Sequence, residues 1–188
     1  MNTALSMMRL ETERLIIRPY MENDLNESFE LMQDPELFTY LHFGVMTLED
    51  YQKLFKWLID SYQTPFDQAF KYSFAIHSKA TGAFIGWCGV GVLDFIAPDK
   101  ELYYLIGQDY WGNGYATEAA AALTAYTFDV IGLDRLYAKA DPRNVASLKI
   151  FKKLGFTFDR ELEGLTGDDE ECNGELMYVL TKEQFRKR

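Results

Sequence analysis

The stretch that decides the fold is 101–123, ELYYLIGQDYWGNGYATEAAAAL. Its first six residues are rich in Tyr, Leu and Ile, which is the composition of a buried strand. The segment 111–116 contains two glycines and predicts a tight turn. The four alanines that follow Glu118 are strong helix formers with small side chains. The sequence therefore predicts a strand, a glycine turn and a helix that follow one another directly.

The glycine turn is a candidate phosphate site. A turn that leads into a helix gathers unpaired backbone N–H groups at the positive end of the helix dipole. Gly112 and Gly114 lack side chains, so a ligand can approach the backbone itself. The glycine pair alone leaves two interpretations open, a site for a pyrophosphate-bearing ligand or a turn with a purely structural role.

A second segment, DPRNVASLKIFKKLGF at 141–156, follows a predicted strand and adds to the first. Together the two segments resemble the GNAT superfamily of acetyl-CoA-dependent N-acetyltransferases. Gly114 and Ala116 fill the small positions of that family's pyrophosphate loop, and Trp111 replaces the usual Arg or Gln. This replacement and the Asn-x-x-Ser…Lys-Leu-Gly-Phe pattern are typical of the branch that includes the ribosomal-protein N-terminal acetyltransferases, the RimJ/RimL type.

The resemblance implies one α/β domain with a mixed sheet, the GNAT acyl-CoA N-acyltransferase fold. We expect this domain at 9–183, with terminal tails at 1–8 and 184–188. Hydrophobic periodicity and turn residues agree with this order of elements. Strands are predicted at 14–19, 71–78, 83–93, 101–106, 133–141, 156–161 and 175–180, and helices at 23–33, from 47, at 116–132 and at 142–154.

Four local features carry further expectations: the helix caps, the strand at 71–78, the loop that contains His42 and the acidic segment at 167–171. Asn23 or Asp24 is expected to cap the first helix, and Thr47 with Asp50 makes a capping-box-like start for the second. The alternation in 71–78 predicts a half-buried strand. The loop between the two helices forms a wall of the acceptor site in the family, and His42, which lies in it, is interpreted as a partly exposed loop histidine. The acidic segment 167–171 is interpreted as a solvated turn.

Composition narrows the function. The 188 residues are 48% hydrophobic and 26% charged, as in a soluble globular protein. A net charge of -10 argues against nonspecific binding to nucleic acid or to an anionic membrane and is compatible with an amine substrate.

Cys88 and Cys172 lack the spacing of a metal site, so we expect no metal and a reduced, cytoplasmic setting. The longest apolar run, 83–93, is too short to span a bilayer. We expect a monomer or homodimer.

The resemblance also implies the binding of acetyl-CoA as co-substrate. Backbone N–H groups at 112–116 would hold the pyrophosphate, and the pantetheine arm would run alongside the strand at 104–106. Asn144 resembles the family's side-chain contact to that arm. The expected acetyl-CoA-binding residues are Tyr104, Leu105, Ile106, Trp111, Gly112, Asn113, Gly114, Tyr115, Ala116 and Asn144.

Two residues are candidates for catalysis. Ser147 matches the branch's serine and is expected to assist departure of the thiolate, since Phe151 stands where many relatives have a tyrosine and cannot donate a proton. Glu101 matches an acidic position of the branch and is expected to accept the amine's proton through a water. The alternatives are an ordinary helix residue for Ser147 and a strand-end surface carboxylate for Glu101.

The acceptor is expected to be a primary amine, either a protein N-terminus or a small molecule. Two rival functions stay open at this point. A dinucleotide-binding enzyme fits the glycine pair, but Asp141 lies too far along the chain for that motif. A non-catalytic acyl-CoA-binding module on the same fold fits the presence of Phe151.

Overall fold

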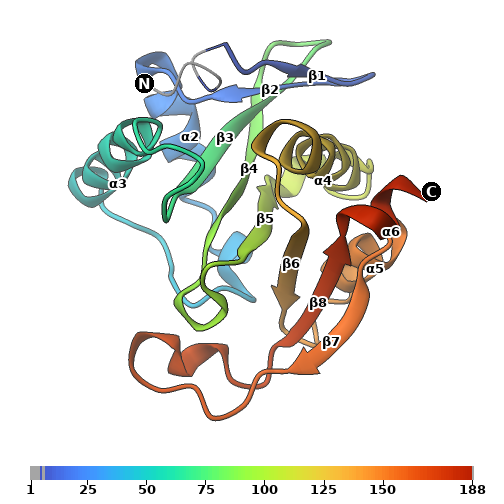
Figure 1. Ribbon diagram of the computed structural model, residues 1–188. Helices are drawn as coiled ribbons and strands as arrows, with labels where there is room; N and C mark the ends of the chain where they lie inside the picture. The colour runs from blue at the N-terminus through green and yellow to red at the C-terminus, as the bar shows by residue number, and fades with distance from the viewer. Residues whose placement is uncertain (1–4, 6, 188) are drawn as a thin grey trace.

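The computed structural model describes residues 5 and 7–187. Their strands form one eight-stranded mixed sheet (Figure 1). The strand order is β1-β2-β3-β4-β5-β6-β8-β7. The strands are β1 (Leu10–Glu11), β2 (Leu15–Pro19), β3 (Lys71–Ser78), β4 (Phe84–Val92), β5 (Lys100–Ile106), β6 (Arg135–Ala140), β7 (Thr157–Glu161) and β8 (Leu176–Thr181). The predicted mixed α/β fold is confirmed, and the two predicted tails lie partly outside the described residues.

Helices cover both faces of the sheet. The helices are α2 (Leu25–Leu31), α3 (Leu48–Ser61), α4 (Tyr115–Tyr126), α5 (Val145–Leu154) and α6 (Lys182–Arg186), and a π-helical turn (Thr127–Ile131) extends α4. Buried side chains of α3 pack with Ala75 of β3 and Leu105 of β5. Buried side chains of α4 pack with Ile76 and Ile106, the next residues along the same strands. Because successive strand residues point to opposite faces, α3 and α4 lie on opposite sides of the sheet.

The pairing of β5 with β6 differs from every other pairing in this sheet. All other neighbours are antiparallel, whereas β5 and β6 are parallel and share a single register pair, Glu101 with Tyr137. Beyond Glu101, the edge of β5 that faces β6 has no strand partner among the described residues. A doubly wound parallel sheet, which the dinucleotide-binding rival requires, is not what the described residues form.

Three local expectations differ from the structure. The strand β3 is buried along almost its whole length, not half-buried, because helices cover both of its faces. The two-residue strand β1, which precedes β2, was not predicted, since two residues carry no periodicity. Asp24 does not cap α2 with its side chain. The predicted Thr47 cap of α3 is confirmed, because its side chain accepts a hydrogen bond from the Asp50 N–H.

Asp24 instead forms a buried charged cluster with Arg18 and His77. The Arg18 guanidinium donates two hydrogen bonds to the carboxylate, at 2.7 and 2.8 Å, and lies 3.0 Å from His77 Nε2, which is also 3.4 Å from the Asp24 carboxylate. Burial alone would raise the pKa of Asp24. Hydrogen bonds from Arg18, His77 and the Met21 N–H outweigh this effect and hold the pKa well below its usual range. This cluster joins β2, β3 and the start of α2.

We predict that Asp24→Asn lowers the free energy of unfolding by about 3–5 kcal/mol at pH 7, because it leaves the Arg18 cation without its buried partner. The contribution of the carboxylate is fully present above its unfolded pKa, about 3.9, and is lost as the pH falls toward the depressed folded value. Urea unfolding of both proteins should therefore show a difference that shrinks below pH about 4. A matched control is Asp60→Asn, which removes an exposed pair with Lys56 and should change stability by less than about 1 kcal/mol. Equal effects of the two changes would contradict this account.

None of the helices in the described part of the chain has the length and apolar character needed to cross a membrane.

Candidate active site

The glycine turn has the predicted conformation. Gly112 and Gly114 have φ values of 76° and 79°, in the left-handed region that favours glycine. Gly114 is the N-cap of α4, and the first helical hydrogen bond recorded there runs from the Glu118 N–H to the Gly114 carbonyl. The N–H groups at 115–117 therefore precede this first bond and are open to a ligand. No atom would lie within 4 Å of a Cβ at Gly112, so the turn is open there. The turn therefore presents open backbone at the start of α4.

Contacts made by two side chains, Trp111 and Arg14, hold the glycine loop in place. The Trp111 indole N–H donates to the Ile106 carbonyl at 2.6 Å and ties the loop to the end of β5. Arg14 donates to the Asn113 carbonyl at 2.8 Å, pairs with Glu118 at 2.6 Å and lies 4.6 Å from the centre of the Tyr115 ring. Sequence analysis missed Arg14, since its partner Asn113 is 99 positions away and no local pattern links them.

A cavity of about 420 Å³ opens beside β5. It is lined by four of the predicted site residues, Glu101, Tyr104, Asn144 and Ser147, and also by Phe151. Glu101 and Tyr104 come from β5, and Ser147 comes from α5. The predicted loop residues 111–116 do not line the cavity but follow β5 in the chain. Leu105 and Ile106 are buried and belong to the hydrophobic clusters on opposite faces of the sheet.

Asn144 has a structural task that sequence analysis did not foresee. Its Oδ1 accepts a hydrogen bond from the Ser147 N–H at 3.1 Å, so it caps α5. The helix was expected to open at Pro142 but begins at Val145, because the side chain of Asn144 satisfies the first turn. The cap fixes the position of Ser147 in the cavity wall. It leaves the Asn144 amide nitrogen for a ligand.

Glu101 is almost fully buried, with 7% of its surface exposed, and is not the surface carboxylate of the alternative interpretation. Burial raises its pKa, and the positive charges of Lys139 and Lys71 offset part of this rise. Burial alone would lower the pKa of Lys139. The carboxylates of Glu101 and Glu175 outweigh this effect and raise it above its usual value. Lys139 therefore stays charged between two buried carboxylates.

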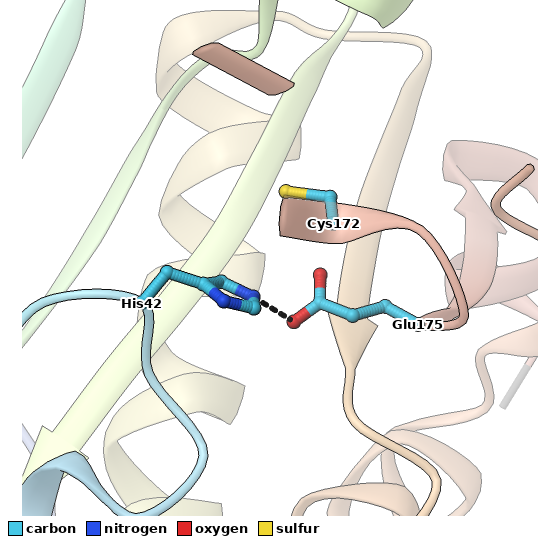
Figure 2. Close-up of side chains that lie close together, drawn as sticks. All are labelled: His42, Cys172 and Glu175. Atoms are coloured by element: carbon cyan, nitrogen blue, oxygen red, sulfur yellow. Dashed lines mark hydrogen bonds and ion pairs between the residues drawn. The ribbon is translucent and has the colours of Figure 1, made fainter. Parts of the chain in front are cut away.

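Glu175, which also lines the cavity, links this charged network to His42. One carboxylate oxygen is 2.6 Å from Lys139 Nζ, and the other is 3.3 Å from His42 Nε2 (Figure 2). His42 comes from the loop before α3, and Glu175 lies just before β8, so the contact bridges two loops that are far apart in the sequence. The histidine is indeed partly exposed, but sequence analysis did not identify its partner.

Cys172 lies beside this contact, and its sulfur, His42 and Glu175 offer ligand atoms within 4.8 Å of one another (Figure 2). The ammonium of Lys139 already neutralises Glu175 at the centre of this group. A metal cation bound there would meet that positive charge, so the donor set fits a hydrogen-bonded network better than a metal ion. The absence of a metal stays a prediction.

The acidic segment expected to be a solvated turn is a 3₁₀ helix (Gly167–Cys172) that borders the cavity. Asp168, Asp169 and Glu171 line the opening. In Figure 1 this segment, drawn in orange-red, lies in the long connection between β7 and β8. Aromatic side chains, among them Trp57 and Trp87, line other parts of the wall. The opening is therefore acidic, and other parts of the cavity wall are aromatic.

The comparisons with known proteins agree with this geometry. The family described as acetyltransferase (GNAT) domain matches residues 14–157. The chain is 31% identical over 183 residues to the "uncharacterized N-acetyltransferase p20" of Bacillus licheniformis, a match that covers 95% of this chain and 99% of the relative. It is 28% identical over 114 residues to the spermidine N(1)-acetyltransferase of Escherichia coli K12, covering 56% and 61% of the two chains.

The fold also matches solved structures. One is the spermidine N-acetyltransferase of Vibrio cholerae in complex with CoA and spermine, with a TM-score of 0.75 over 93% of this chain and 99% of the other. The two sequences are 15% identical, so this likeness concerns the fold alone. The family match, by contrast, spans most of the chain, and with it the rival of a non-catalytic module is set aside. The chain belongs to the GNAT acetyltransferase family and is an acyltransferase.

Proposed function

We propose that the protein transfers the acetyl group of acetyl-CoA to a primary amine by direct attack within a ternary complex. One observation carries this proposal. Glu101 and Ser147 line the same cavity, and the glycine loop that suits a pyrophosphate follows the strand on which Glu101 lies. A base, a hydroxyl for the leaving group and an anion site are thus arranged around β5.

Acetyl-CoA would bind along β5. Its pyrophosphate would accept hydrogen bonds from N–H groups at 112–116, and its pantetheine arm would lie beside 104–106. The edge of β5 facing β6 is without a strand partner beyond Glu101, so it can receive an extended arm as a strand receives a neighbour. A backbone N–H there would also stabilise the oxyanion of the tetrahedral intermediate, an effect worth about 3–4 kcal/mol where measured.

Glu101 would take the proton of the amine through a water. A lysine-type amine has a pKa of about 10.4, so far less than a hundredth of it is neutral at pH 7. Burial strengthens the carboxylate as a base by raising its pKa. The positive charges of Lys139 and Lys71 offset part of this rise.

Ser147 would assist the thiolate as it leaves. A thiol has a pKa of about 8.5, so the thiolate is a tolerable leaving group and this assistance need only be modest. Phe151, which has no ionisable group, lies in the same wall and leaves the serine as the hydroxyl contributed by α5.

The acceptor would be a positively charged amine. Asp168, Asp169 and Glu171 at the opening attract cations, and the aromatic wall suits a ligand ammonium group. Two kinds of acceptor fit. The sequence pattern of the ribosomal-protein branch supports a protein N-terminus, and the relative named for spermidine supports a small polyamine.

We place the enzyme in the cytoplasm, as a monomer or homodimer with one domain at 9–183.

The first prediction concerns the pyrophosphate loop. Gly114→Val adds bulk where the backbone must approach the phosphates and should reduce acetyl-CoA affinity by calorimetry to an undetectable level. The change also strains a left-handed residue. Gly132→Val is a matched control, because Gly132 has a φ of 86° and lies at the far end of the same helical segment. The control should lose similar thermal stability and keep its affinity. Unchanged affinity in Gly114→Val would refute the loop assignment.

The second prediction tests the reaction itself. Acetyl-CoA incubated with the enzyme should release free thiol only when a primary amine is present, and the amine should gain one acetyl group by mass spectrometry. The panel should contain spermidine, simple monoamines and peptides with basic or acidic second residues. Cationic acceptors should give the higher kcat/KM, and added salt should narrow the difference. A preference for acidic or neutral acceptors would contradict the proposed role of the acidic opening.

The third prediction concerns Glu101. Glu101→Gln keeps the size of the side chain and removes its basicity, so the rate with a lysine-type amine at pH 7 should fall by about 10²–10⁴. Raising the pH should restore much of the loss, because more of the amine is then neutral without help. Glu163→Gln, at an exposed position outside the cavity, is the control and should leave the profile unchanged. A normal pH–rate profile for Glu101→Gln would place the base elsewhere.

A further inference from the structure

Two buried hydroxyl groups in the described part of the chain have no hydrogen-bond partner, those of Tyr104 and Tyr126. A buried polar group without a partner destabilises the folded state, so most such groups in proteins are paired. Each of these two hydroxyls therefore calls for a reason.

The two tyrosines differ in their surroundings. Tyr126 lies on α4 within the large hydrophobic cluster and does not line the cavity. Tyr104 lies on β5, beyond Glu101, where the partner strand β6 has separated, and it lines the cavity. Its neighbour Tyr103 also lines the cavity, but the hydroxyl of Tyr103 already donates to the Tyr72 carbonyl at 2.8 Å. Tyr104 is thus a residue of the cavity wall whose hydroxyl is buried and, among the described residues, has an unused donor.

The position of Tyr104 relates it to the leaving-group side of the cavity. Its ring meets the Phe151 ring edge-on, with centroids 6.5 Å apart and an interplanar angle of 69°. Burial raises the pKa of Tyr104, and the nearby Ser147 side chain offsets part of the rise. Phe151 contributes no polar group. The wall shared by β5 and α5 therefore presents two hydroxyls close together, those of Tyr104 and Ser147.

We propose that the Tyr104 hydroxyl donates a hydrogen bond to the sulfur of acetyl-CoA as the thioester breaks, and that it is a catalytic residue beside Ser147. This inference rests on the proposed acetyl transfer. It explains why a hydroxyl is kept at a buried position where phenylalanine would pack equally well and would be more stable in the free protein.

The chemical step balances without a further reactant. The amine nitrogen forms a bond to the carbonyl carbon, the C–S bond breaks, and its electron pair goes to sulfur. The ammonium loses one proton through a water to Glu101 before the attack, and the nitrogen loses a second as the tetrahedral intermediate collapses; both protons pass to solvent. Tyr104 keeps its own proton, because a phenol of pKa about 10 is a weaker acid than a thiol of pKa about 8.5, and burial widens the gap. It acts as a hydrogen-bond donor to the thiolate, not as a proton source.

Tyr104→Phe tests this role, because the change removes only the hydroxyl. We expect kcat to fall about 10-fold to 100-fold, the effect of losing a hydrogen bond to a charged group, with little change in KM for the amine. We also expect the melting temperature to stay equal or rise, because an unpaired buried group is gone. Tyr126→Phe is the matched control and should show the same thermal response with an unchanged kcat. Full kcat in Tyr104→Phe would overturn the proposal.

Binding of CoA and of desulfo-CoA, which lacks the sulfur, gives a second readout that needs no acceptor. The native enzyme should prefer CoA, and the preference should grow as the pH rises through the thiol pKa of about 8.5. Tyr104→Phe should lose about 10-fold of this preference, and Tyr126→Phe should keep it. An equal preference in the native enzyme and Tyr104→Phe would overturn the proposal. Absence of amine-dependent thiol release from the native enzyme would instead overturn the proposed function, so the two failures are distinguishable.

Discussion

The parting of β5 from β6 is the constraint on which the rest of this site depends. The two strands are parallel neighbours that share a single register pair, at Glu101 and Tyr137. A continuous ladder would satisfy the edge of β5 and would close the space beside it. Because the ladder stops, the backbone edge of β5 is available to an extended ligand, and side chains of β5 and α5 line a common cavity. The glycine loop and α4 then follow β5 directly, so the anion site is built on the same strand.

A network of charged side chains lies on the side of the cavity where we expect the amine to bind. Glu101 and Glu175 are buried, Lys139 is half-buried beside them, and His42 connects Glu175 to the loop before α3. Isolated buried charges are costly, and this alternation of signs makes the group tolerable. The same arrangement keeps a carboxylate in the cavity with a raised pKa, which a proton acceptor for an amine requires. The same four side chains thus pair their charges in the folded protein and include the carboxylate that we propose as the base.

The sequence predicts what depends on neighbouring residues. The strand, glycine turn and helix at 101–123 follow from composition and from the need for glycine at positive φ, and the left-handed conformations of Gly112 and Gly114 agree with that prediction. Contacts between distant segments lie beyond such reasoning. The bracing of Asn113 by Arg14 and the contact of His42 with Glu175 join residues 99 and 133 positions apart. Asp24 shows a different failure, since a helix cap was expected from the local sequence but its carboxylate pairs with Arg18 of β2 and approaches His77 of β3 instead.

The measurement that tests the account most directly is a crystal structure of the enzyme with CoA and an amine acceptor bound together. The account predicts that the pyrophosphate contacts N–H groups at 112–116 and that the pantetheine arm lies in the gap between β5 and β6. The sulfur should lie within hydrogen-bonding distance of the Tyr104 and Ser147 hydroxyls, and the amine should lie on the Glu101 side, one water away from the carboxylate. A CoA molecule bound outside the parted strands, or an amine remote from Glu101, would contradict it.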